Sequence, residues 1–246
     1  MRDIRQILEG VYFGNYFIDA LLMLRNSMLL SVLTYNLEVS INLTKKDLKQ
    51  LDEVDCFLLK KMLNLSSKSS RTLLHGELGI VSVEFHIKQK RILYLHHLLS
   101  SETESLAHDV LIQMIQNPKK GDWLEEVKND LRDFDLSSDI EQIKHFSKNQ
   151  IKDLVKKRSR ETYFRLLLND KSKLSKGQEI VYQSFEQQTY LKPSSNLTSD
   201  EMKKIMKIRI RDVDLKCNFP NFYKDKKCLA APLCHLDYSN SQVIEQ

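Results

Sequence analysis

Residues 44–62, TKKDLKQLDEVDCFLLKKM, carry the clearest signal for the fold. Thr44 is followed three residues later by Asp47, an acidic variant of the capping box that begins many helices. Apolar residues then recur at helical spacing, at Leu48, Leu51, Val54, Leu58 and Met62. The stretch therefore predicts an amphipathic helix that turns one apolar face toward a core.

Helical signals recur along most of the chain. Three further capping pairs precede segments of helical apolar spacing: Asp122 with Glu125, Ser138 with Glu141, and Ser147 with Gln150. Gly79 ends another short segment, because glycine best tolerates the left-handed position after a helix. Six glycines and four prolines in 246 residues are few for a β-sandwich or barrel. We therefore predict an all-α fold, a multi-helix bundle of roughly ten helices with an irregular C-terminal tail after Asp212.

The most apolar stretch, residues 17–35, nearly has the length of a membrane span. It contains Asp19, Arg25 and Asn26, however, and a central charge costs at least ~2.5 kcal/mol in a bilayer. The stretch is therefore predicted to be a buried helix, and no membrane contact is expected.

A polar run at residues 169–177 is the best candidate for a domain boundary. It divides the chain into a helical bundle (1–168), a linker with a minor helix (169–198), and a terminal helix with its tail (199–246). The four cysteines are too sparse for a disulfide framework, and no signal peptide is evident. We expect an intracellular protein, with nucleus and cytoplasm not distinguished.

Catalytic motifs are missing from the sequence. It has no Gly-rich phosphate loop, no Gly-x-Ser-x-Gly, no His-Glu-x-x-His and no adjacent Asp-Asp pair. The acidic pairs Asp52 with Asp55 and Asp130 with Asp133 are expected on exposed helix faces. Cys56 is expected to be a small core residue, because no histidine or basic partner is implied nearby. These observations predict a non-enzyme without a small-molecule substrate.

Positive charge is concentrated in one part of the chain. The net charge is +5, and residues 151–211 contain 15 Lys and Arg against 7 Asp and Glu. Such an excess favours contact with an acidic partner such as a nucleic-acid backbone, although a solvated helix surface has the same composition. The candidate nucleic-acid-binding residues form two groups: Lys88, Lys90 and Arg91, and Lys156, Lys157, Arg158 and Arg160.

The tail contains residues that could bind a metal. Cys217, Cys228, Cys234 and His235 are soft ligands of the kind that hold structural zinc in a tetrahedron. Their spacing is poor, because five residues separate Cys228 from Cys234 and no second ligand pair follows. We therefore predict that this set does not hold a stoichiometric zinc and that the chain has no cofactor.

An ordered series of short blocks resembles a known family. The blocks are LRNSMLL at 24–30, LTKKD at 43–47, ELG at 77–79, KR at 90–91, LHH at 95–97 and NPKKGDW at 117–123. Their order and approximate spacing are similar to the region that follows the palm in non-LTR retrotransposon reverse transcriptases. The similarity covers most of the chain.

This resemblance implies a non-catalytic fragment of a reverse transcriptase polyprotein. Residues 1–168 would correspond to thumb-like helices that grip primer and template, downstream of a palm that holds the catalytic metals. In the tail, APLC at 231–234 resembles the first element of the family's Cys/His knuckle with alanine replacing a cysteine. Only Cys234 is kept as a ligand, so the tail would be a degenerate knuckle.

Three functions remain open from the sequence. The first is nonspecific binding of RNA or DNA through the two basic groups, because phosphate contact needs basic side chains on rigid helices. The second is a helical protein-interaction module. The third is a decaying remnant without a function. Salt-dependent binding to nucleic acid separates the first from the others.

Overall fold

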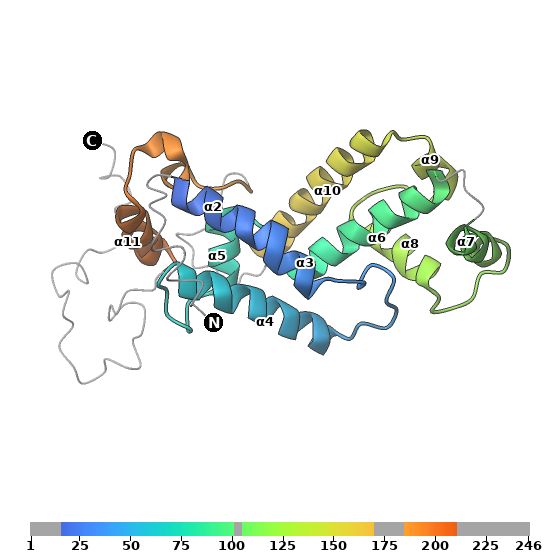
Figure 1. Cartoon of the computed structure of the whole chain (residues 1–246), viewed down its shortest axis with the longest axis horizontal. Helices are drawn as coiled ribbons and strands as arrows, with labels where there is room; N and C mark the ends of the chain where they lie inside the picture. Colours follow the sequence, from blue (N-terminus) through green and yellow to red (C-terminus); the bar gives the residue numbers. More distant parts are fainter. Residues whose placement is uncertain (1–15, 101–104, 170–184, 211–246) are drawn as a thin grey trace.

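The structure, a computed structural model, describes residues 16–100, 105–169 and 185–210. Within these ranges every regular element is a helix, which confirms the predicted all-α fold (Figure 1). The tail after Asp212 and most of the predicted boundary at 169–177 lie outside the described residues.

One half of the fold surrounds a core that contains Leu59, Leu74 and Met202. Its elements are α2 (Phe17–Leu24), α4 (Lys45–Met62), α5 (Arg71–Leu78) and α11 (Ser199–Arg209). The π-helical turn η2 (Arg25–Leu29) and α3 (Leu30–Leu33) continue α2, and Leu30 packs in a smaller cluster with Val83 and Ile87. Two short 3-10 turns, η3 (Thr189–Leu191) and η4 (Pro193–Ser195), precede α11. The terminal helix α11 thus packs into the same core as helices more than a hundred residues earlier (Figure 1).

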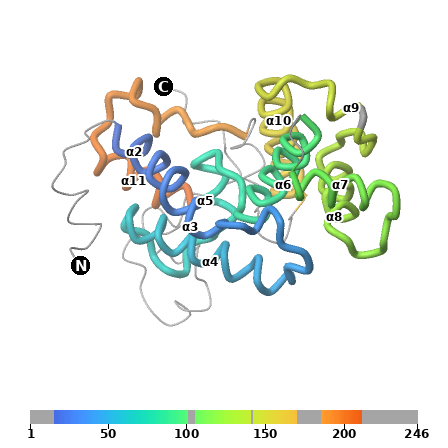
Figure 2. The backbone as a smooth tube through the Cα atoms, turned by 45° about the vertical axis from the view of Figure 1, so that its right-hand side comes forward, coloured from blue at the N-terminus to red at the C-terminus, as the bar shows by residue number. Residues whose placement is uncertain are grey.

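The other half surrounds a core that contains Leu95, Leu124 and Phe134. Its elements are α6 (Val83–Ser100), α7 (Leu106–Gln116), α8 (Trp123–Asp133), α9 (Ile140–Lys144) and α10 (Lys148–Asn169). Figures 1 and 2 show α6 between α10 and α8, so α6 is the central helix of this half. Phe164 of α10 packs against both cores and joins the two halves.

Local signals in the sequence set the helix ends. Thr44 and Asp47 form the predicted capping box of α4, with both reciprocal hydrogen bonds present. The Asp122 side chain accepts the Glu125 N–H at 2.7 Å and begins α8. Gly79 ends α5 with a φ of 62°, in the left-handed region as predicted. These ends are fixed because the side chains satisfy backbone groups that the helices leave without partners.

The predicted buried helix at 17–35 is wrong in one respect. Ile18, Leu21 and Leu30 are buried, but an apolar stripe remains exposed on α2 to α3 and the residue after them: Met23, Met28, Val32 and Tyr35. No helix in the described part of the chain is long and apolar enough to cross a membrane.

Candidate functional site: a basic edge on α10 and a buried cysteine-histidine cluster

The first predicted basic group, on α6, is engaged by acidic residues. Lys88 Nζ lies 2.8 Å from Asp133 Oδ2 and 2.9 Å from Glu84 Oε1. Lys90 Nζ lies 3.2 Å from Glu38 Oε2. The two cations therefore tie α6 to neighbouring parts of the chain, and a phosphate would have to displace carboxylates to reach them.

Arg91, the third member of that group, is buried in an ion-pair network. Its guanidinium lies 3.3 Å from Asp130 and 3.0 Å from Glu126, and it also donates to the Ser40 carbonyl. Asp130 is only 4% exposed, so the prediction that it lies on an exposed face is wrong. Helix α6 supplies the opposite charge that allows a carboxylate of α8 to be buried.

Burial raises the pKa of Asp130 to about 6, because the loss of hydration outweighs the attraction of Arg91 and Lys88. A carboxyl with a raised pKa in the folded state contributes stability that is fully present below its ordinary pKa. That contribution is lost as the pH rises through about 6.

The free energy of unfolding of the wild type should therefore fall between pH 4 and pH 6, whereas Asp130→Asn lacks this carboxyl. We expect the difference between the two proteins to change in favour of the variant by about 1 kcal/mol per pH unit. The measurement is the free energy of unfolding from urea titrations at several pH values. Parallel curves for the two proteins over this range would contradict the prediction.

The second predicted basic group lies on α10, and its four members differ in their surroundings. Lys156 and Lys157 are exposed. Arg158 pairs with Glu161 at 3.2 Å. Arg160 donates to the Gly79 carbonyl at 3.0 Å, so this side chain helps to hold α10 against the end of α5.

Two further lysines, which were not predicted from the sequence, extend this surface. Lys148 and Lys152 are exposed, and with Lys156 they form a series at i, i+4 and i+8 on one side of α10. We call Lys148, Lys152 and Lys156 the lysine edge. No hydrogen bond or ion pair joins the side chains of these three lysines or of Lys157 to another described residue. The i+4 spacing is visible in the sequence and could have identified the edge.

A hollow beside this edge has mixed charge. Its lining contains Lys156, Lys157 and Arg160 but also three acidic residues, and Phe164 and Phe185 form its apolar part. The acids reduce the attraction of the hollow for an anion. The lysine edge is therefore the stronger candidate for phosphate contact.

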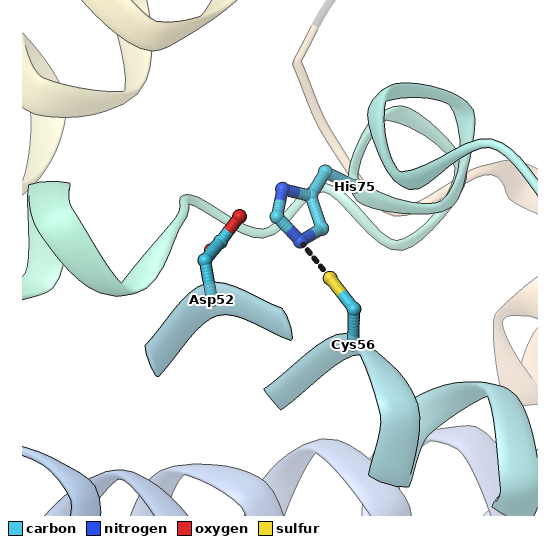
Figure 3. Close-up of side chains that lie close together, drawn as sticks. All are labelled: Asp52, Cys56 and His75. Carbon is cyan, nitrogen blue, oxygen red and sulfur yellow. Dashed lines mark hydrogen bonds between the residues drawn. The ribbon is translucent and has the colours of Figure 1, made fainter. Parts of the chain in front are cut away.

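A second candidate site is buried between α4, α5 and α10. Cys56 Sγ lies 3.2 Å from His75 Nε2, and the other ring nitrogen, Nδ1, lies 2.5 Å from the Tyr163 hydroxyl. Figure 3 shows Asp52 and Cys56 projecting from α4 toward the imidazole of His75. The prediction that Cys56 has no histidine partner is therefore wrong, although its burial in the core is confirmed.

Burial disfavours the charged forms of all three side chains, and it raises the pKa of Asp52 as well. It raises the pKa of the Cys56 thiol to about 12, with the nearby carboxylates of Asp52 and Asp55 adding to the effect. It lowers the pKa of His75 to about 3, helped by the Arg25 and Arg71 cations. A protonated thiol beside a neutral imidazole is not an activated nucleophile.

The two carboxylates of α4, Asp52 and Asp55, are less exposed than predicted. Asp55 is fully buried and pairs with Arg25, whose Nη2 lies 2.7 Å from Asp55 Oδ2. Asp52 is partly buried: Oδ1 accepts the Val83 N–H at 3.1 Å, and Oδ2 lies 3.2 Å from Arg71. Neither carboxylate lies on a fully solvated face, because η2 supplies the partner of Asp55 and α5 and α6 supply those of Asp52.

The predicted tail ligands Cys217, Cys228, Cys234 and His235 lie outside the described residues. Comparisons of the chain with protein-family models, with curated proteins and with solved structures found no match. A functional proposal therefore rests on the chemistry of the two candidate sites.

Proposed function

We propose that this protein binds the sugar-phosphate backbone of nucleic acids, without sequence preference, through the lysine edge of α10. The observation that carries the proposal is that the side chains of Lys148, Lys152 and Lys156 are exposed and unpaired among the described residues. Their neighbour Lys157 adds a fourth cation that has no partner in the described part of the chain. Cations held by carboxylates would have to give up a partner before binding phosphate, and these would not.

The spacing of the edge suits a phosphate chain. Successive lysines four residues apart on a helix are separated by about 6 Å along its axis. Phosphates of one strand advance by about 3.4 Å along the duplex axis and also rotate around it, so neighbouring phosphates lie farther apart than this rise, at a separation comparable with that of the lysines. Each phosphate that a lysine neutralises releases condensed counterions, which makes this kind of binding independent of sequence and sensitive to salt.

Helix α10 also provides a rigid support. Ile151 and Val155 are buried in the core against α6, and Ser159 hydrogen-bonds to Gln89 of α6. The lysines therefore project from a packed helix, so that ordering on binding costs only their own side-chain entropy.

The test is a variant in which Lys148, Lys152, Lys156 and Lys157 are all replaced by glutamine. We expect weaker binding to every duplex sequence alike, and a salt slope flatter by about 0.9 units for each phosphate that is no longer neutralised. Helicity should be kept, because glutamine has nearly the helix propensity of lysine. The measurement is duplex DNA affinity at several salt concentrations.

A matched control separates position from overall charge. Lys45, Lys119, Lys120 and Lys204 are also exposed and lie on other parts of the chain. Their replacement by glutamine gives the same net charge as the lysine-edge variant. It should leave most of the DNA affinity and of its salt dependence intact. Equal losses of affinity in both variants would mean that overall charge, and not the lysine edge, drives binding.

The proposed origin of this activity is the thumb-like region that the sequence resembles. On this proposal the chain is a non-catalytic fragment of a retrotransposon reverse transcriptase polyprotein, and thumb helices need only basic side chains to hold a backbone. A palm-encoding sequence directly upstream in the genome would support the origin. Metal-dependent nucleotide incorporation by the purified chain would contradict the non-catalytic part.

The exposed apolar stripe on α2 and α3 favours a second candidate function, a protein-interaction module. Met23, Met28, Val32 and Tyr35 are exposed apolar side chains within thirteen residues, of the kind that partner helices cover. Absence of salt-dependent nucleic-acid binding by the wild type would favour this candidate over the first.

A further inference from the structure

Asp52, Cys56 and His75 form a set of three potential metal ligands. One ligand atom from each of them lies within 4.8 Å of the other two. Asp52 and Cys56 are four residues apart on α4, so they share one face of the helix, and His75 approaches that face from α5 (Figure 3). The three residues therefore converge through the packing of two consecutive helices.

We propose that these three side chains bind one zinc ion between α4 and α5, with a water molecule as the fourth ligand. The proposal is independent of nucleic-acid binding. It also differs from the expectation from the sequence, which considered zinc only in the tail and predicted none.

The donor set favours zinc over harder cations. Thiolate and imidazole are ligands that Mg²⁺ and Ca²⁺ avoid, because those ions prefer oxygen. Zinc accepts sulfur, nitrogen and carboxylate oxygen together, at about 2.3 Å for sulfur and about 2.0–2.2 Å for nitrogen and oxygen. A tetrahedron with these bond lengths places its ligand atoms roughly 3.3–3.6 Å apart.

The present distances are close to this requirement. Cys56 Sγ and His75 Nε2 are 3.2 Å apart and would have to separate by a few tenths of an ångström. The ligand atoms of the set are nowhere more than 4.8 Å apart, so the adjustment that one ion would require is small.

Surrounding residues already orient two of the ligands. The Tyr163 hydroxyl lies 2.5 Å from His75 Nδ1 and can accept its proton, which leaves the Nε2 lone pair facing Cys56. Metal-bound histidines characteristically have such a partner on the second nitrogen. The Val83 N–H and Arg71 hold the Asp52 carboxylate, whose remaining lone pairs are available to the ion.

Proton balance follows from the chemistry of the ligands. His75 is neutral in the folded protein, which is the form that binds metal. Cys56 carries a proton without a metal, because burial raises its pKa to about 12. Zinc binding forms the Zn–S bond and releases that proton to solvent, so the affinity should increase with pH.

The experiment uses the full chain with the tail ligands removed. In this background Cys217, Cys228 and Cys234 are replaced by serine and His235 by asparagine, so that metal bound by the tail cannot be mistaken for the core site. Zinc content is measured after dialysis, and Co²⁺ is titrated while the thiolate-to-cobalt absorption band is recorded. We expect one metal ion per chain and a band from a single thiolate.

Two variants in the same background test the assignment. Cys56→Ala should abolish the thiolate band and reduce zinc affinity by more than about 100-fold, which exceeds the usual effect of an outer-shell change. Tyr163→Phe should keep the band and reduce affinity by about 10-fold to 100-fold, because it removes only the partner of His75. Circular dichroism of each variant checks that the helices are intact.

Two results would overturn the proposal. The first is a folded background protein that binds no metal and gives no cobalt band; if the wild type binds zinc in that case, the zinc lies in the tail. The second is a Cys56→Ala variant that binds zinc as tightly as the background. The first result is read on the background protein alone, so it does not depend on whether the variants fold.

Discussion

Replacing Asp55 with alanine is expected to lower the free energy of unfolding by about 3–5 kcal/mol. Asp55 is 0% exposed and Arg25 is 4% exposed. The Arg25 guanidinium donates to both carboxylate oxygens, from Nε to Oδ1 at 2.8 Å and from Nη2 to Oδ2 at 2.7 Å. The variant would leave the Arg25 charge buried, with only neutral acceptors such as the Val81 carbonyl at 3.1 Å.

A double replacement shows whether the loss of stability comes from the unpaired charge. Arg25→Met with Asp55→Leu removes both charges and fills the space with apolar groups, and buried ion pairs replaced in this way often lose little stability. We expect the double variant to be more stable than Asp55→Ala in urea titrations followed by circular dichroism. A double variant as unstable as the single one would show that side-chain packing, and not an unpaired charge, causes the loss.

Features that depend on neighbouring residues could be predicted from the sequence. The capping box at Thr44, the caps at Asp122 and Ser147, and the left-handed Gly79 all satisfy backbone groups within four residues of themselves. Such contacts do not depend on how distant parts of the chain are arranged. This is why the all-α fold and these four helix ends followed from the sequence. The predicted pair before α9 includes the Glu141 side chain, which lies outside the part of the chain that the structure describes.

The environment of charged side chains could not be predicted in the same way. Asp55 meets its partner 30 residues away, and Asp130 meets Arg91 at a separation of 39. A periodicity argument predicts that such residues are exposed to solvent, because it contains no information about cations on other helices. The candidate sites depend on this information, since it separates the engaged lysines of α6 from the lysine edge of α10, which is unpaired among residues 16–100, 105–169 and 185–210.

The cysteine-histidine cluster was missed for a related reason. Asp52 and Cys56 at i and i+4 were visible as a pair on one helix face. The approach of His75 depends on how α5 folds back onto α4 after the serine-rich connection, which the sequence pattern does not specify. A search for potential metal ligands at i, i+4 with a histidine in the next helix could have suggested the cluster.

Gly79→Ala is expected to destabilise the protein by roughly 3 kcal/mol through two additive causes. The φ of 62° costs a residue with a Cβ about 1 kcal/mol or more. The added Cβ would also lie closer than 3.0 Å to backbone atoms of Glu186 and Gln187, which cross over the end of α5. Overpacking of this kind typically costs about 1–3 kcal/mol, and backbone cannot rotate aside as a side chain can.

Gly121 provides a matched control, because its φ of 79° is also positive while nothing lies within 4 Å of its added Cβ. Gly121→Ala should therefore cost only the conformational part, about 1 kcal/mol. The difference in unfolding free energy between the two variants measures the contact between the end of α5 and the segment that leads to η3 and α11. Equal destabilisation would mean that this segment does not rest on Gly79.

Hydrogen exchange shows which backbone hydrogen bonds the Gly79→Ala substitution weakens. The Gln188 N–H donates to the Glu77 carbonyl at 3.1 Å, directly beside Gly79. If the alanine Cβ pushes the segment away, the Gln188 amide should lose protection in Gly79→Ala and keep it in Gly121→Ala, while amides in the middle of α6 remain protected in both. Unchanged protection of Gln188 in a destabilised Gly79→Ala variant would assign the whole loss of stability to the strained φ.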